Sequence, residues 1–174
     1  MGKQSGPRSV SQLRFPSRNH PQQVAARGAL DEVDDRWTPL HIWIPWNDRF
    51  AFTLDAAASH RNHLCPRYFT RAENGLEQSW AGERVWCNPP FSDLPAWVAK
   101  AEREASACPV IVLLVPANRT EQRWWQEHVE PRRDRGLGLA VEFLPRRIKF
   151  ASENNLGAWS ASSPPFGCAL LIYA

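Results

Sequence analysis

The sequence predicts an α/β fold in which helices cover both faces of a largely parallel sheet. Residues 109–116 form an unbroken apolar run, which is typical of a strand buried on both faces of a parallel sheet. A second apolar run, residues 85–87, lies upstream, and residues 92–107 between the two runs have helical periodicity behind a Ser-Asp cap. A strand, a helix and a strand in this order indicate a parallel unit.

Length and composition bound the class of protein. The chain has 174 residues, of which 43% are hydrophobic and 11% aromatic, so we expect one domain with a substantial core. No apolar run approaches the roughly 18 residues of a membrane span, and the N-terminus has no apolar signal core. These observations predict a soluble, intracellular protein that does not contact a membrane.

The positive net charge of +3 arises in the N-terminal segment. Residues 1–30 contain five basic side chains and no acidic one, so the rest of the chain carries more acidic than basic residues. Gly, Pro, Ser and Gln accompany them without helical or strand periodicity, which is the composition of a mobile arm. We therefore predict a basic, disordered arm over residues 1–30 and one domain over residues 31–174. The arm either touches nucleic acid or is a passive leader.

The first elements of the domain surround an acidic residue at a strand end. Thr38 is placed to cap a helix whose first residue is Pro39. Residues 50–59 then predict a strand that ends at Asp55 and a run of small residues, and residues 65–70 predict a short aromatic strand. Ligands of α/β sheets bind outside the carboxyl ends of strands, where small residues let backbone amides approach, so this segment fits a cofactor pocket.

The loop after the apolar run 85–87 is the candidate chemical site. Pro89 and Pro90 remove two backbone donors and fix φ at about −65°, which leaves nearby carbonyls and the Asn88 side chain as acceptors in fixed geometry. Two such acceptors suit the exocyclic amino group of a planar nitrogen base, and Phe91 offers a ring on which that base can stack. The alternative is an ordinary turn after a strand, because Asn and Pro are common turn residues.

The remaining segments complete the sheet. Residues 121–129 predict a helix whose paired tryptophans, Trp124 and Trp125, we assign to core and interface and not to base intercalation. Residues 140–150 predict two short strands around a basic turn, and residues 163–173 predict a final apolar strand. Pro164-Pro165-Phe166 has the shape of the candidate loop without its Asn, so we assign it no chemistry.

The cysteines and histidines predict neither a disulfide framework nor a metal site. Cys65, Cys87, Cys108 and Cys168 are far apart and contain no C-x-x-C pair, so we expect buried free thiols. His60 and His63 lie near Cys65 but have no second ligand pair elsewhere, so we expect loop histidines and no bound metal.

Several segments, in this order, resemble the phage-type DNA N6-adenine methyltransferase family, over about residues 35–174. They are Trp37-Thr38-Pro39, Phe52-Thr53-Leu54-Asp55-Ala56-Ala57-Ala58-Ser59, Tyr68-Phe69-Thr70, Asn74-Gly75-Leu76 and Trp86-Cys87-Asn88-Pro89-Pro90-Phe91. That family lacks the usual glycine-rich turn after the first strand, as this chain does. It often has Asp where this chain has Asn74, and an Asn can still hydrogen-bond an adenine ring.

The resemblance implies a Rossmann-like, S-adenosylmethionine-dependent methyltransferase sheet with helices on both faces. It implies a phage or prophage protein that acts on double-stranded DNA in the cytoplasm of a bacterial host. By the same resemblance, the catalytic residues are Asn88, Pro89, Pro90 and Phe91, and the residues that bind S-adenosyl-L-methionine are Trp37, Thr38, Pro39, Asp55, Ala56, Ala57 and Asn74.

Three basic residues are candidates for contact with the substrate. Arg119 lies just past the carboxyl end of the strand at 109–116, where a guanidinium can hold a phosphate or a carbonyl. Arg146 and Lys149 belong to the basic turn, which either contacts the DNA backbone or is a solvated edge protected by charge.

The mechanism that follows is methylation of a flipped-out adenine. Phe91 stacks on the base, while Asn88 and the Pro89 carbonyl accept the two amino hydrogens, so no strong base is needed. The same loop suits RNA adenine, cytosine N4 or a protein glutamine. A further alternative is a catalytically silent DNA-binding protein that blocks nucleases. The sequence gives neither the recognised DNA word nor the oligomeric state.

Overall fold

The computed structural model describes residues 34, 36–151 and 164–174. The predicted N-terminal arm lies outside these residues, as does most of the loop after residue 151. The helices are α3 (Leu40–Phe50), α4 (Leu94–Glu104), the 3-10 helix η1 (Ala105–Ala107) and α5 (Arg123–His128). The strands are β1 (Leu54–Asp55), β2 (Arg67–Tyr68), β3 (Arg84–Cys87), β4 (Val110–Pro116), β5 (Leu139–Phe143) and β6 (Cys168–Tyr173).

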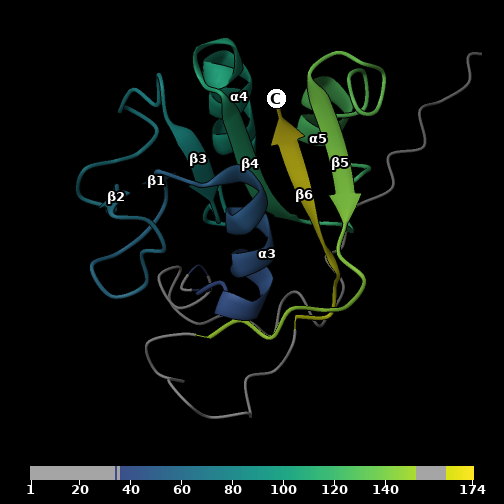
Figure 1. Cartoon of the computed structure of the whole chain (residues 1–174). Helices are drawn as coiled ribbons and strands as arrows, with labels where there is room; N and C mark the ends of the chain where they lie inside the picture. Colours follow the sequence, from purple (N-terminus) through teal and green to yellow (C-terminus); the bar gives the residue numbers. More distant parts are fainter. Residues whose placement is uncertain (1–33, 35, 152–163) are drawn as a thin grey trace, which may run out of the picture.

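The strands form one six-stranded sheet in the order β2-β1-β3-β4-β6-β5 (Figure 1). The first four strands of this order are mutually parallel. Strand β6 lies antiparallel between β4 and β5, with Ile111 opposite Tyr173 on one side and Leu139 opposite Tyr173 on the other. The mixed α/β fold predicted from the sequence is therefore confirmed, with an antiparallel strand inserted near one edge.

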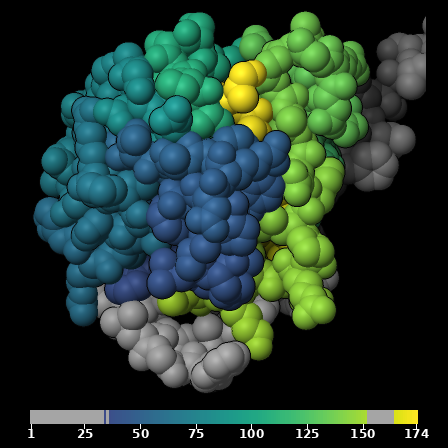
Figure 2. Space-filling view, in the orientation of Figure 1, coloured from purple at the N-terminus to yellow at the C-terminus, as the bar shows by residue number. Residues whose placement is uncertain are grey.

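Helices cover both faces of the sheet because its central strands are apolar on both sides. In β4, Ile111 and Leu113 pack on the same side as α4 and α5, while Val112 and Leu114 pack on the side of α3. All seven residues of β4 are buried, as the unbroken apolar run predicts. Figure 2 shows the residues of α3, in blue, covering the centre of the other face.

The apolar stripe of α4 and the two tryptophans of α5 lie as the sequence predicts, but the predicted Ser-Asp cap of α4 is wrong, because Asp93 makes no capping hydrogen bond and Ser92 binds Asp34. Leu94, Trp97 and Val98 are buried on one side of α4. Trp124 and Trp125 are only 3% and 1% exposed, which assigns them to the core, where each large aromatic side chain contributes about 1.5–3 kcal/mol of burial or more. The four cysteines are free thiols, and all but the half-buried Cys108 are buried.

The predicted start of the first helix is wrong. Helix α3 begins at Leu40 with Pro39 as its N-cap residue, and no side chain caps it. The Thr38 hydroxyl is buried and has no hydrogen-bond partner in the part of the chain that is described. The helix ends at Phe50, and the residue that follows it, Ala51, adopts a left-handed φ of 51°. Phe50, predicted to begin a strand, is therefore the last helical residue.

Two strand predictions also need correction. Only Leu54–Asp55 of the predicted strand 50–59 forms a strand, because the chain bends after Asp55, although neighbouring amides still bond to the adjacent strands. The predicted hairpin over residues 140–150 does not form, because β5 finds its partner in β6, far away in sequence. Residues 144–150, which follow β5, form no strand, and Ile148 and Phe150 are buried in the α3 layer.

The described residues contain neither a helix that could cross a membrane nor a cluster of metal-binding side chains. No helix there has both the length and the apolar character needed to cross a membrane. No group of three or more His, Cys, Asp or Glu side chains there is arranged to hold a metal ion.

Candidate active site

The candidate loop lies at the edge of the sheet where the parallel strands end. Strands β1 and β3 are parallel neighbours, with Asp55 opposite Trp86, so their carboxyl ends meet at the same edge. The Ala56 amide donates a hydrogen bond to the Trp86 carbonyl at 2.9 Å, which extends the pairing one residue beyond β1. Asn88 follows directly after β3. The two sequence motifs, separated by some thirty residues, are thus brought together.

A cleft of about 460 Å³ opens at this edge. Its volume is within the usual range for a small-molecule site. The lining residues come from four parts of the chain: Asp34 and Arg36; Ala56, Ala57, Ala58, Ser59 and Asn62; Phe69, Thr70, Arg71, Asn74, Gly75 and Leu76; and Asn88, Pro90, Ser92, Asp93 and Trp97.

The Asn88 side chain is held in one orientation. Its Nδ2 atom donates a hydrogen bond to the main-chain carbonyl of Arg36. A carbonyl can only accept, so the contact assigns the nitrogen end of the amide to Arg36. The Oδ1 atom is buried and has no hydrogen-bond partner among the described residues. Asn88 therefore presents an unused acceptor at the cleft, which is unusual because buried polar atoms are nearly always paired.

The Phe91 ring lies beside the cleft and not in its lining. Its centroid is 6.0 Å from that of Phe150 and 6.1 Å from that of Phe166. The Arg36 guanidinium lies over the Phe91 ring at 4.8 Å from the centroid. The ring that is predicted to stack on a base is therefore covered by a planar cation in this structure. Phe166, to which we assigned no chemistry, supports Phe91 by packing.

Small residues and one glycine shape the opposite wall. A Cβ atom on Gly75 would lie 2.1 Å from the Ala56 carbonyl oxygen, so only glycine permits this approach of two backbone segments. Asn74 has a φ of 53°, and its Oδ1 accepts a hydrogen bond from the Leu76 amide at 3.3 Å. Ala56, Ala57 and Asn74, which the resemblance assigns to the cofactor, all line the cleft.

Asp55 is buried and does not line the cleft. Its Oδ2 accepts a hydrogen bond from the Leu64 amide at 3.0 Å, while Oδ1 is buried without a hydrogen-bond partner among the residues that the structure describes. Burial raises the pKa of Asp55 to about 6, against the opposing influence of the Leu64 and Ala57 amides. The carboxylate lies directly before Ala56 and Ala57 in the chain, so it supports the wall of the cleft.

Other predicted residues lie outside the cleft lining. Trp37 pairs with Ala151 in an antiparallel bridge, and Thr38 and Pro39 lead into α3. Arg119 is half-buried, with an Nε atom that has no partner within the described ranges.

The two candidates of the basic turn, Arg146 and Lys149, are exposed on the surface after β5. The hairpin on which their prediction was based is not formed.

The structure adds residues that the sequence argument did not assign. Asp34 accepts hydrogen bonds from the Ser92 amide, at 3.2 Å, and from the Ser92 hydroxyl. Arg36 contacts both Asn88 and Phe91, and Asp93 lines the cleft. The one available signal was the acidic run that directly precedes the Trp-Thr-Pro motif, but these contacts join segments more than fifty residues apart.

The fold and the cleft define a class of protein: an α/β protein with a cleft at the carboxyl ends of adjacent parallel strands, the place where such sheets bind ligands. The family can also be identified. The sequence profile of the family described as DNA N-6-adenine-methyltransferase (Dam) matches residues 27–171, so the chain belongs to this family.

A curated relative is similar over much of the chain. The DNA N-6-adenine-methyltransferase of Escherichia phage T1 is 30% identical over 123 residues, which are 69% of this chain and 48% of the relative. The chain therefore spans about half the length of the relative that it matches.

Proposed function

We propose that this chain transfers a methyl group from S-adenosylmethionine to N6 of adenine in double-stranded DNA. The observation that carries the proposal is the Asn88 side chain, whose donor end is engaged by Arg36 and whose acceptor end is buried and unused. Membership of the Dam family and the phage relative support the same activity. They also support a phage or prophage origin and action in the cytoplasm of a bacterial host.

The fold and the cleft fit the cofactor. We infer a Rossmann-like methyltransferase sheet, in which the cofactor lies outside the carboxyl ends of β1 and β3. Ala56 and Ala57 have no bulky side chains, so backbone and ligand can approach closely, and Asn74 offers an amide near its Gly75 neighbour. The buried Asp55 does not touch the cofactor in this proposal but supports the cleft wall that Ala56 and Ala57 form. When bound, S-adenosylmethionine supplies an electrophilic methyl group.

The residues of the loop then act by positioning and electrostatics. Asn88 Oδ1 and the Pro89 carbonyl accept the two hydrogens of the target amino group, which turns the nitrogen lone pair out of conjugation with the ring. Such preorganised acceptors need no strong base. Pro89 and Pro90 keep the loop rigid, since each fixes its own φ angle.

The target base enters as a flipped nucleotide, because its amino group is inaccessible in a stacked duplex. Phe91 stacks on the base once the Arg36 guanidinium has left the ring. Outside the cleft, Arg146 and Lys149 are exposed cations that contact backbone phosphates, which provide affinity without sequence information. Arg119 contacts the phosphate nearer to the flipped nucleotide.

A nucleoside analysis tests this proposal. The purified protein is incubated with S-adenosylmethionine and adenine-unmethylated duplex DNA, and the digested nucleosides are identified by mass spectrometry, with Asn88→Ala as the control. We expect N6-methyladenine from the parent protein only. N4-methylcytosine, or methylation of RNA or of a glutamine peptide in parallel reactions, would assign another planar amino group. Binding of DNA without any methyl transfer would favour the silent DNA-binding protein.

A further inference from the structure

The inference concerns why the loop carries an amide and not a carboxylate. Both side chains offer an oxygen that accepts from an amino group, but an amide also has a donor end. An amide works as the acceptor only if its nitrogen is turned away from the base. Some other group must therefore hold the Asn88 nitrogen.

The Arg36 carbonyl is in the position to do this. It accepts the hydrogen bond from Asn88 Nδ2, across 52 residues of sequence. The orientation that results leaves Oδ1 buried and without a partner among the described residues. Because the burial strengthens electrostatic interactions, this acceptor has a strong preference for a donor that enters the cleft.

The carbonyl is itself held in place from both sides. On one side, the Asp34 carboxylate accepts hydrogen bonds from the amide and hydroxyl of Ser92, in the same loop region as Asn88. On the other side, the Trp37 amide donates to the Ala151 carbonyl at 2.8 Å, and the Ala151 amide returns a bond of 3.2 Å. We call Asp34, Arg36 and Trp37 the strap.

We propose that the strap positions Asn88 for catalysis, and that its Arg36 carbonyl makes an amide, and not a carboxylate, the working residue at position 88. This inference rests on the proposed function of Asn88 and assigns the strap a role that the function alone does not require. Arg36 is a positioning residue in this proposal, since it acts on the base through Asn88.

The proposal makes Asn88→Asp damaging, although the two side chains have the same shape. A carboxylate oxygen would face the Arg36 carbonyl oxygen, and both atoms can only accept. Protonation relieves the conflict, because a neutral carboxyl can donate to Arg36 and still offer its other oxygen to the amino group. The pKa of the introduced carboxyl in the folded protein is therefore raised. Turnover falls as the pH rises through this raised pKa, whereas the stability penalty is absent below the ordinary pKa of about 4, grows up to the raised value and is complete above it.

The experiment compares the parent, Asn88→Asp and Asn88→Ala by turnover at pH 8 and pH 6, and by melting temperature at pH 8 and pH 4. At pH 8 we expect Asn88→Asp to be slower than the parent by at least about tenfold and to melt below Asn88→Ala. At pH 6 the ratio of Asn88→Asp to parent turnover rises several-fold. At about pH 4, near the pKa of an unfolded-state carboxyl, the melting temperatures of the two variants converge. Turnover of Asn88→Asp near that of the parent at pH 8, or a ratio that does not change with pH, would overturn the proposal.

Two further variants locate the effect in the strap. Arg36→Ala removes the guanidinium but keeps the carbonyl, so the pH signature of Asn88→Asp persists in that background. Asp34→Ala removes the hydrogen bonds between Asp34 and Ser92, so one side of the strap is no longer held. The pH dependence of Asn88→Asp should therefore be weaker in that background. The melting comparison does not require methyl transfer. A parent protein without activity would therefore contradict the proposed function, whereas the absence of the pH-dependent melting difference would contradict the role of the strap.

Discussion

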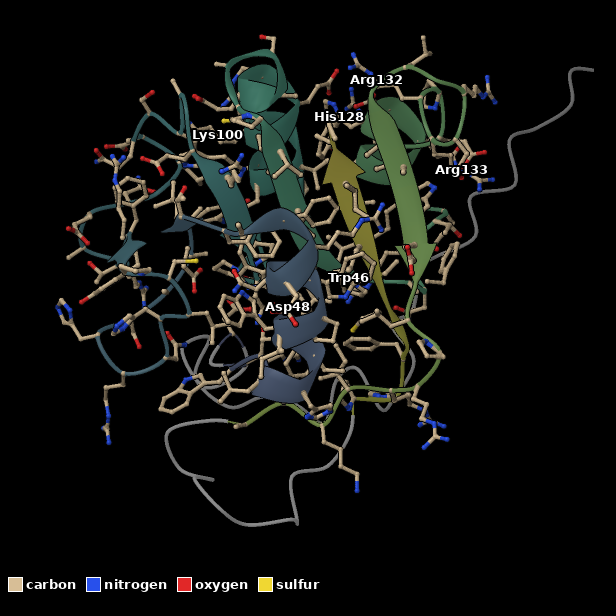
Figure 3. The ribbon with its side chains drawn as sticks, in the orientation of Figure 1. Trp46, Asp48, Lys100, His128, Arg132 and Arg133 are labelled. Atoms are coloured by element: carbon tan, nitrogen blue, oxygen red, sulfur yellow. The ribbon has the colours of Figure 1, made fainter. Side chains whose placement is uncertain are left out.

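Buried polar atoms lack partners at the cleft end of the parallel strands, whereas at the opposite end polar side chains are paired. Asn88 Oδ1, Asp55 Oδ1 and Thr38 Oγ1 are all buried near the cleft without a hydrogen bond from the described residues. At the opposite end, the Glu102 carboxylate binds His128 at 2.6 Å and also binds Arg132. Figure 3 shows His128, Arg132 and Lys100 at that end of the molecule.

The difference separates two uses of polar side chains. At the far end, the contacts of Glu102 join α4 to His128, the last residue of α5, and to Arg132 in the segment that follows. These contacts contribute to stability. One exception is the hydroxyl of Tyr173, which is buried there without a partner and whose pKa is raised by burial. Unpaired atoms at the cleft cost stability, because desolvation is not compensated, and a protein retains them where a ligand supplies the partner. Changes at the two ends should therefore have opposite effects.

The largest effect is expected from Asn88→Ala. The variant loses an acceptor that acts on the amino group in the transition state, so kcat falls by about 10²–10³. The variant loses the hydrogen bond to the Arg36 carbonyl, but it also removes the buried Oδ1 atom, which has no partner among the described residues. The two effects oppose each other, so the melting temperature changes little. Turnover and thermal melting are measured together, with cofactor binding as a control. A large loss of stability with little loss of turnover would mean that Asn88 serves the fold, as the paired residues at the far end do, and not the reaction.

Asp55→Asn should increase stability and decrease function. The folded-state pKa of about 6 lies above the ordinary 3.8, so the folded protein holds this proton more tightly than the unfolded chain does. The resulting penalty is absent below pH 3.8, grows between pH 3.8 and 6, and reaches at most about 3 kcal/mol above pH 6.

The asparagine variant avoids the penalty and keeps an acceptor for the Leu64 amide. Urea unfolding at pH 8 should therefore show a more stable variant, and the gain should vanish near pH 4. Calorimetry should show weaker binding of S-adenosylmethionine. Equal stability of variant and parent at pH 8 would mean that the carboxylate is not penalised by burial.

Glu104→Gln tests the far end. Lys100 Nζ lies 2.7 Å from the Glu104 carboxylate, with side chains only 8% and 18% exposed, and the variant leaves this buried cation without its counter-charge. We expect a loss of about 1–2 kcal/mol, which is a melting temperature lower by about 2–8 °C, with turnover unchanged. Glu127→Gln, in the exposed pair with Arg123, is the matched control and should melt like the parent.

The pH dependence of this pair has the opposite sign to that of Asp55. Burial raises the pKa of the Glu104 carboxyl, but hydrogen bonds from Lys100 and from the Trp80 amide outweigh it and leave the pKa below the ordinary 4.5. Its contribution is present above pH 4.5 and is lost as the pH falls through the folded-state value. Acid unfolding of the parent should therefore be steeper than that of Glu104→Gln.

Arg36→Ala is expected to have the smallest effect. The guanidinium covers Phe91 at 4.8 Å and must leave before a base can stack there, so its removal should lower the KM for DNA by about two- to tenfold. Burial lowers the pKa of Arg36, because the guanidinium is partly desolvated where it lies over the Phe91 ring. Steady-state kinetics with varied DNA measure the effect. A higher KM would instead make Arg36 a contact to DNA.

Much of the architecture follows from the sequence because buried strands have unmistakable apolar runs. Strands β4 and β6 were predicted in this way, and helix α4 was predicted from its helical periodicity. Local patterns failed where distant pairing decides the outcome. The hairpin after residue 140 was wrong because β5 pairs with a strand that comes much later in the chain.

The strap could not be predicted for the same reason. Nothing in the local sequence indicates that the Arg36 carbonyl binds Asn88, because a main-chain oxygen has no residue type. Trp37 and Pro39 were assigned to the cofactor, but they do not line the cleft in this structure. Their role remains a prediction that a cofactor-binding measurement on Trp37→Ala would test.

The position of β6 also constrains how the protein folds. Strand β5 precedes β6 in the chain, yet among the described residues it pairs only with β6, and all six residues of β6 are buried. Until β6 joins the sheet during folding, β4 and β5 each have an edge with unpaired backbone groups. Such edges can pair with other chains. The folding chain therefore depends on Cys168–Tyr173 to join β4 to β5, and a chain in which this strand has not yet docked is exposed to aggregation.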